Sequence, residues 1–190
     1  MHPHRLLSLS PAFAVKLAVA STSVPQLTSG VTAIDIIGDG SPAIALLSHR
    51  ENFNAHSFDL LTLYWIDRPS DGTAPIWQVI PIVSKDGSPE QDSALRSGGA
   101  DCVLQDFRIV NGNHGPAQLI LAKRDFGKSF VDPGPVTFHF YELRDNKQGI
   151  PGFPKYYYEE SRILRAKRSY CDVGDAFQKE LNIGTYGAER

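Results

Sequence analysis

The chain has 190 residues, of which 42% are hydrophobic and 21% are charged, and its formal net charge is -2. This length can bury a sizeable core. The near-neutral charge gives no electrostatic basis for binding nucleic acid or an anionic membrane surface, so we expect neither as a partner. The 16 glycines and 13 prolines favour the many turns of an all-β chain.

The first twenty residues have the outline of a secretory signal. Residues 1–20 begin with basic side chains, continue through a short apolar stretch and end in Ala18-Val19-Ala20. Pro11 interrupts the apolar run and Lys16 lies beside the expected cleavage point, so a leader without an export role is the alternative. No stretch reaches the roughly 20 apolar residues that span a bilayer. We therefore expect a signal or leader, and a periplasmic or secreted protein without a membrane span.

A first β unit is predicted over residues 31–83, after a polar linker at residues 21–30. Its apolar runs, separated by glycine- and proline-bearing turns, are typical of strands. Pro81 places the last strand at a sheet edge, because proline cannot donate a backbone hydrogen bond. The predicted strands are residues 31–37, 43–48, 58–66 and 76–83.

A second β unit is predicted over residues 100–169, after a polar linker at residues 84–99. Within the tail, residues 170–190, the apolar Val173, Phe177 and Leu181 recur every four residues, which predicts a helix over residues 172–182. The predicted strands of the second unit are residues 102–110, 117–123, 136–143 and 155–163.

The same marker residues recur in the same order in the two units, which predicts an internal repeat. Asp35 corresponds to Asp106, Pro42 to Pro116 and Tyr64 to Tyr141. The alternative is two unrelated sets of hairpins that share common turn residues. The predicted fold is mainly β, with two duplicated four-stranded antiparallel units and a C-terminal helix. The units are either propeller-like blades or halves of a sandwich.

The two cysteines, Cys102 and Cys171, favour a disulfide, because an exported chain with an even cysteine count commonly pairs them. The bridge would close a loop of about 70 residues and stabilise the fold by about 4 kcal/mol in the chain-entropy model. Two buried thiols are the alternative.

Motifs for catalysis are absent from the sequence. There is no GxSxG or SxxK pattern, and His49, His56, His114 and His139 lack zinc-binding spacing. Ser48 precedes His49 in a predicted strand, where neighbours face opposite sides. The sequence predicts no catalytic residues, no metal site and no cofactor. Acid and base residues carried on loops have no fixed spacing in sequence, so a hydrolase is the alternative.

Three residues are candidates for ligand binding. Arg50 and Arg124 end corresponding strands, and each is followed by an acidic residue and a phenylalanine. Arginine can hold a carboxylate through two parallel hydrogen bonds, although a structural ion pair is the alternative. Tyr157 lies in an aromatic cluster that suits a pocket or a protein interface, or packs under a loop. The basic run over residues 162–168 is interpreted as a solvated strand or helix face.

The turn DIIGDG, residues 35–40, resembles the calcium turn of FG-GAP and related β-propeller repeats. Asp35 and Asp39 keep two of its positions, but Ile37 and Ala43 stand where oxygen ligands belong. Calcium takes six to eight oxygen ligands. The resemblance therefore implies a strand–turn–strand and no metal.

The chain as a whole resembles the carbapenem intrinsic-resistance proteins of the CarF and CarG type. The resemblance spans most of residues 31–183, includes the leader-like start, and carries no specific site motif. The segments that carry it are CVLQDFRIV (102–110), LILAKRDFG (119–127), VTFHFYEL (136–143), PGFPKYYYE (151–159) and YCDVGDAFQKEL (170–181). It implies a periplasmic all-β protein that protects carbapenem producers without hydrolysing the drug.

Together these observations predict an exported, non-catalytic binding or protection protein. Its partner is either a small anionic molecule such as a β-lactam or another protein of the cell envelope. The alternatives are a hydrolase and a pure protein-interaction module.

Overall fold

The computed structural model describes residues 23–186 except 55, 99–101, 113–114 and 128. The predicted leader, residues 1–20, lies outside the described residues. The elements are β1 (Gly30–Ile34), β2 (Ala43–Arg50), β3 (Phe58–Asp67), β4 (Ile76–Val79), β5 (Ile82–Val83), β6 (Ala94–Gly98), β7 (Val103–Val110), β8 (Gln118–Arg124), β9 (Gly134–Asp145), β10 (Tyr156–Tyr170) and α1 (Val173–Leu181).

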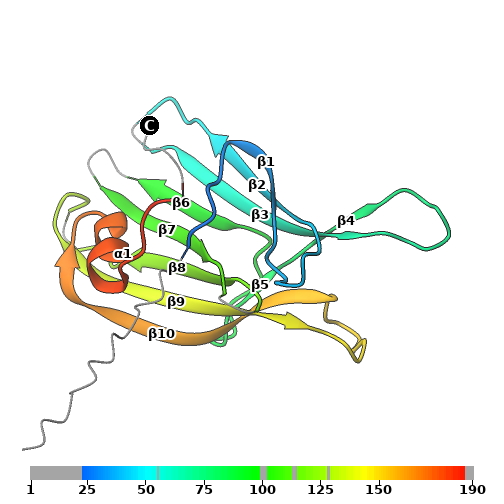
Figure 1. Ribbon diagram of the computed structural model, residues 1–190. Coiled ribbons are helices and arrows are strands. Elements are labelled where there is room, and N and C mark those ends of the chain that lie inside the picture. The colour runs from blue at the N-terminus through cyan, green and yellow to red at the C-terminus, as the bar shows by residue number, and fades with distance from the viewer. Residues whose placement is uncertain (1–22, 55, 99–101, 113–114, 128, 187–190) are drawn as a thin grey trace, which may run out of the picture.

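All the described strands belong to one sheet, in the order β1-β2-β3-β6-β7-β8-β9-β10-β5, with β4 paired to β3. The strands β1 to β4 form one antiparallel meander and β7 to β10 form another. Figure 1 shows β1–β3 and β7–β10 as two groups of strands, with α1 beside the second group. The predicted mainly β fold with a C-terminal helix is confirmed. The internal repeat stays a prediction.

The segment at residues 84–99, expected to be a linker, contains β6. This short strand pairs with β3 on one side and with β7 on the other, so it joins the two groups in one sheet. The sequence ALRSG has no apolar alternation that would predict a strand, and only Ala94 in it is fully buried, at 1% exposure.

The strand expected over residues 76–83 is divided in two. Its first part, β4, pairs with β3, and its second part, β5, pairs with β10 in parallel. Between them, Ile80 donates its N–H to the Leu63 carbonyl (2.8 Å), and Pro81 accepts a hydrogen bond from the N–H of Tyr158 (2.8 Å). Pro81 has no N–H to continue the pairing with β3, so the chain crosses from β3 to β10 at this point.

Two apolar clusters form the core. The larger one lies between the two groups of strands and includes Leu61, Leu63, Phe107, Leu119 and Tyr158. The smaller one lies under α1 on the other face of β8 and β9, and its residues are Val110, Ile120, Ala122, Val136, Phe138, Phe140, Tyr170, Val173, Ala176, Phe177 and Ile183. The helix therefore covers the second meander on the face away from the first.

The helix has the expected amphipathic face and defined ends. Asp172 is the N-cap, and its carboxylate accepts a hydrogen bond from the N–H of Gly174 (2.6 Å). Asn182 ends the helix in the left-handed conformation. Phe177 points from this helix onto Phe138, with ring centroids 5.4 Å apart. No helix in the described part of the chain is long and apolar enough to cross a membrane.

The calcium-like turn is a tight connection between β1 and β2. The Asp35 carboxylate accepts hydrogen bonds from the N–H groups of Gly38 (2.7 Å) and Gly40 (3.1 Å). Gly38 packs directly against Gly115 in the turn between β7 and β8, where an added Cβ would lie 2.4 Å from the Gly115 carbonyl. The two turns that correspond in sequence thus lie against each other, and Asp35 is occupied in shaping one of them.

Candidate functional site

Arg124 is buried, at 3% exposure, and supports the loop that follows it. Its guanidinium donates to the carbonyls of Phe130 (2.6 Å), Asp132 (2.7 Å) and Cys171 (3.2 Å). These bonds hold Phe130, Asp132 and the residue before the α1 N-cap, Cys171, close to the end of β8. Arg124 is therefore placed as a structural residue, and its buried position gives an external carboxylate no approach.

The other two candidates, Arg50 and Tyr157, are accessible and lie on different strands from Arg124. Arg50 is exposed at the end of β2 and lies over the ring of Phe58, 5.8 Å from its centroid. The register places Arg50 four strand spacings, about 19 Å along the sheet, from the end of β8. Tyr157 packs on Phe153 at the opposite end of the sheet (centroids 5.5 Å apart). The structure does not bring the three candidates together.

A buried ion pair closes the uncovered part of β7. Because β6 pairs only with Val103 and Gln105, the edge of β7 beyond them has no strand partner among the described residues. The Asp106 carboxylate accepts from the N–H of Phe107 (2.8 Å), and Arg108 donates to the Phe107 carbonyl (2.6 Å) and to Asp106 (2.7 Å). Burial raises the pKa of Asp106, and the nearby arginines oppose that change. This pair completes a strand edge.

Arg108 also anchors the end of the chain. Its Nε donates to the Gly184 carbonyl (2.7 Å), and its guanidinium stacks on the rings of Phe177 (4.5 Å) and Tyr186 (5.3 Å). From Asp106 the ion pairs continue through Arg96 (3.7 Å) towards Asp59. These contacts tie β3, β6, β7 and the tail together.

A second polar group lies where β9 and β10 meet the segment after β5. His139 contacts the buried Glu160 (2.6 Å), and the Tyr141 hydroxyl contacts that of Ser84 (3.2 Å). Glu160 also accepts a hydrogen bond from the N–H of Lys85 (3.2 Å). Burial raises the pKa of Tyr141, so this hydroxyl keeps its proton at neutral pH. A histidine oriented by a buried carboxylate can act as a base in hydrolysis.

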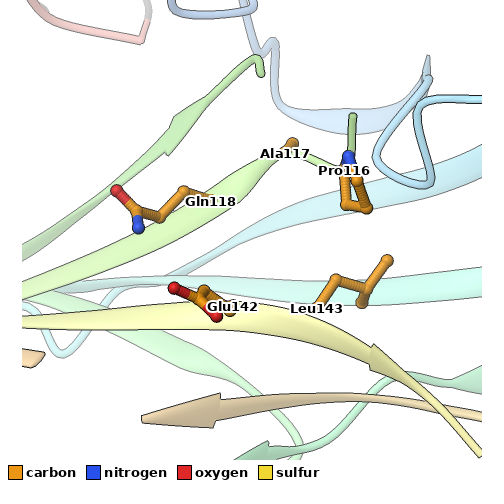
Figure 2. Close-up of a pocket in the computed structure, with 5 residues that line it drawn as sticks. All are labelled: Pro116, Ala117, Gln118, Glu142 and Leu143. Atoms are coloured by element: carbon orange, nitrogen blue, oxygen red, sulfur yellow. The ribbon is translucent and has the colours of Figure 1, made fainter. Parts of the chain in front are cut away.

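Two surface hollows differ in charge. The first, of about 220 Å³, lies between the ends of β8 and β9 (Figure 2). It is lined by Pro116, Ala117, Gln118, Glu142 and Leu143. Its one charged side chain, Glu142, would repel an anionic ligand. Among the described residues, no group of three or more His, Cys, Asp or Glu side chains is arranged to hold a metal ion.

The second hollow, of about 430 Å³, is basic and lies between the end of β10 and α1. We call it the basic hollow, and it is lined by Lys167, Arg168, Tyr170, Lys179 and Glu180. The three cations outnumber the single carboxylate. The buried Tyr170 donates its hydroxyl to Glu180 (2.7 Å), and this bond lowers the pKa of Glu180. The arrangement suits a small anion.

The position of Lys179 explains why sequence reasoning missed the basic hollow. The basic run on β10 was visible in the sequence, and its interpretation as an exposed strand face is confirmed for residues 162–165 and 167–168. Lys179 comes from α1, and its Nζ lies 5.9 Å from the centroid of the Tyr170 ring. Only the packing of α1 on β9 and β10 brings it to Lys167 and Arg168.

The predicted disulfide is present. Cys102, just before β7, pairs with Cys171, just before α1, with a Cα–Cα distance of 5.5 Å. Asp172 adds a second tie beside it, because its carboxylate accepts from the N–H of Val103 (3.3 Å). The bridge fixes the start of α1, and so the position of Lys179, relative to the sheet.

Comparisons with known proteins agree with the resemblance found in the sequence. The family model described as carbapenem resistance protein CarG-like matches residues 27–179. No curated protein matches the chain. The crystal structure of CarG superposes with a TM-score of 0.65 at 24% identity, over 83% of this chain and 94% of that one, which shows a shared fold. Since the family model spans most of its length, the chain belongs to the CarG-like family of carbapenem resistance proteins.

Proposed function

We propose that this chain protects against carbapenems by binding the drug without hydrolysing it, after export from the cytoplasm. The observation that carries the proposal is the basic hollow, an open surface depression of about 430 Å³ whose lining includes two lysines and one arginine. That volume falls within the roughly 300–1,000 Å³ of small-molecule sites. Carbapenems carry a ring carboxylate, and Arg168 offers the bidentate donor geometry that suits it.

The other sides of the hollow suit the rest of such a ligand. The Tyr170 ring offers an apolar face for a compact bicyclic ring, and the tyrosine hydroxyl is already engaged with Glu180 (2.7 Å). Lys179 pairs with Asp175 (2.7 Å) at an exposed position, so it can turn to an anion at little cost.

Export is supported by the disulfide between Cys102 and Cys171. Disulfides persist in oxidising compartments and are rare in the cytosol. An envelope location would place the protein where a carbapenem meets its targets.

Isothermal titration calorimetry with a purified carbapenem tests the binding. Arg168→Ala is expected to weaken binding by roughly 10- to 100-fold, as for the loss of a charge-assisted hydrogen bond, and Lys179→Ala is expected to weaken it in the same direction. Lys147→Ala, an exposed lysine on the β9–β10 hairpin, is the control and should bind as the parent does. Equal affinity in all the variants would remove the basic hollow as the site.

Hydrolysis is a second candidate function, favoured by the contact between His139 and Glu160 (2.6 Å) beside Tyr141 and Ser84. Absorbance of the carbapenem ring chromophore separates the two functions. Under the binding proposal the chromophore persists over many equivalents of drug. Its catalytic loss, abolished in His139→Ala and Glu160→Gln, would establish the hydrolase instead.

A further inference from the structure

The outer edge of β10 is open for most of its length. On one side β10 pairs with β9, but on the other side β5 reaches only Tyr158 and Glu159. Residues 161–169 therefore present an edge with no strand partner in the described chain. Figure 1 shows β10 as a long border strand of the second group. Such an edge carries backbone groups ready to pair with another strand.

The regular part of this edge is Arg162–Arg165, between two register shifts in the pairing with β9. Both apolar side chains in it are exposed, Ile163 at 57% and Leu164 at 38%. Because neighbouring strand residues face opposite sides, each face of the strand presents one arginine and one aliphatic side chain. Arg162 lies over the Phe140 ring (3.9 Å), and Arg165 pairs with the exposed Asp125 (3.0 Å).

The charge of the edge selects its partner. Residues 161–169 hold four basic side chains and no acidic one, in the sequence SRILRAKRS. Two copies of this chain that paired antiparallel through RILR would set arginine opposite arginine, which is destabilising. An acidic segment would form an ion pair with an arginine on each face of the strand. Opposite residues of paired strands share a face, so the complementary order is acidic, apolar, apolar, acidic.

We propose that the edge of β10 at Arg162–Arg165 binds an extended segment of a partner protein with the core order acidic–apolar–apolar–acidic, which adds to the sheet as a further strand. Backbone hydrogen bonds supply affinity and the side chains supply selectivity, as in other cases of strand addition. Because RILR has the same pattern in both directions, a parallel and an antiparallel partner satisfy it equally.

The test uses the full chain and a fluorescein-labelled peptide with blocked ends and the core Glu-Val-Val-Glu, flanked by serine and threonine. Fluorescence anisotropy is expected to show binding of this peptide. The peptides with Lys-Val-Val-Lys and Val-Glu-Glu-Val cores are expected to bind at least about tenfold more weakly, because the charges or the register are wrong. Equal binding of Val-Glu-Glu-Val, or equally strong binding of an oligonucleotide of matched charge, would overturn the proposal.

Charge reversal in the protein gives an independent check. Arg165→Glu is expected to weaken binding about tenfold and to restore binding to a peptide with one glutamate replaced by lysine. Lys147→Glu changes the net charge equally and should leave binding unchanged. Arg165 is 66% exposed, so folding is expected to be preserved. Equal losses in the two variants would reduce the interaction to nonspecific attraction and overturn the proposal.

Amide hydrogen exchange followed by NMR identifies strand addition directly. The bound Glu-Val-Val-Glu peptide is expected to protect alternate amides within residues 161–166. Binding without this protection would overturn the added strand. Lys179→Ala, which tests the basic hollow, should leave peptide binding intact, so failure of the drug-binding proposal and failure of this one are distinguishable.

Discussion

The side chains of Arg108 and Asp106 replace the hydrogen bonds of a neighbouring strand, because together they pair with the N–H and the carbonyl of Phe107. Removing the arginine alone leaves the buried Asp106 carboxylate without its closest partner, with only the more distant Arg96 (3.7 Å) beside it. We expect Arg108→Met to cost about 3–5 kcal/mol in the free energy of unfolding, measured by urea denaturation.

The double variant Asp106→Asn/Arg108→Met is the control for this prediction. It removes both charges but keeps an acceptor for the Phe107 N–H. It should therefore be more stable than the single variant. If the double variant were the less stable of the two, the cost would come from lost packing on Phe177 and not from the unpaired charge.

Alanine substitutions at Gly38 and Gly40 distinguish the cost of backbone strain from the cost of a steric clash. Both have φ of +81°, but a Cβ on Gly38 would meet Gly115, whereas nothing lies within 4 Å of a Cβ on Gly40. We expect Gly40→Ala to cost about 1–2 kcal/mol, the strain of a left-handed alanine. Gly38→Ala should cost about 1–3 kcal/mol more, because the two turns must separate. Thermal denaturation of the pair measures the difference, and equal costs would argue against close packing of the turns.

Single residues were the hardest to predict from the sequence. The pairing of Cys102 with Cys171 follows from their number and from the leader-like start, and it is confirmed. Arg124 ends a strand as Arg50 does, yet one is buried under carbonyls and the other is exposed. The difference arises because the carbonyls of Phe130 and Asp132 fold back onto Arg124, and no local sequence pattern encodes that arrangement.

At the scale of elements, the disulfide joins the start of β7 to the start of α1 across 69 residues of sequence. Its loss is expected to lower the free energy of unfolding by about 4 kcal/mol, because the unfolded chain regains the freedom of a long loop. Urea denaturation of Cys102→Ala/Cys171→Ala measures this. The Asp172 contact with Val103 remains in the variant, so the native fold is expected to persist below the transition. An unchanged midpoint would contradict the prediction.

Strands with strong apolar runs were predictable and short polar ones were not. The runs in β2, β8 and β9 and the fourfold spacing in α1 follow from local periodicity. The strand β6 has no such pattern and exists because β3 and β7 flank it. The basic hollow escaped prediction for the same reason, since it needs the packing of α1 on the sheet.

For the molecule as a whole, buried tyrosines predict sensitivity to alkali. Burial raises the pKa of Tyr158 far above its ordinary value of 10, and its hydroxyl donates to the Ala117 carbonyl (3.0 Å). Burial also raises the pKa values of Tyr141 and Tyr186. Above pH 10 the unfolded chain loses these protons while the folded chain keeps them. The stability is therefore complete below pH 10 and falls above it, by about 1.4 kcal/mol per pH unit for Tyr158 and for Tyr186.

Urea denaturation between pH 7 and pH 11 checks this dependence. At pH 7, Tyr158→Phe should be less stable than the parent because it loses a buried hydrogen bond. The gap should shrink above pH 10, where the variant has one fewer buried tyrosine to titrate. A gap that stays constant to pH 11 would contradict the assignment to Tyr158.

The crossing at Ile80 and Pro81 also constrains the order in which the newly made chain can finish folding. Ile80 finds Leu63 soon after both leave the ribosome, but the Pro81 carbonyl must wait for Tyr158, which is translated much later. The first meander therefore leaves the ribosome before the strand β10, with which residues 81–83 pair, has been made. Until β10 is synthesised, β5 has no strand to pair with, and the nascent chain cannot complete its native sheet.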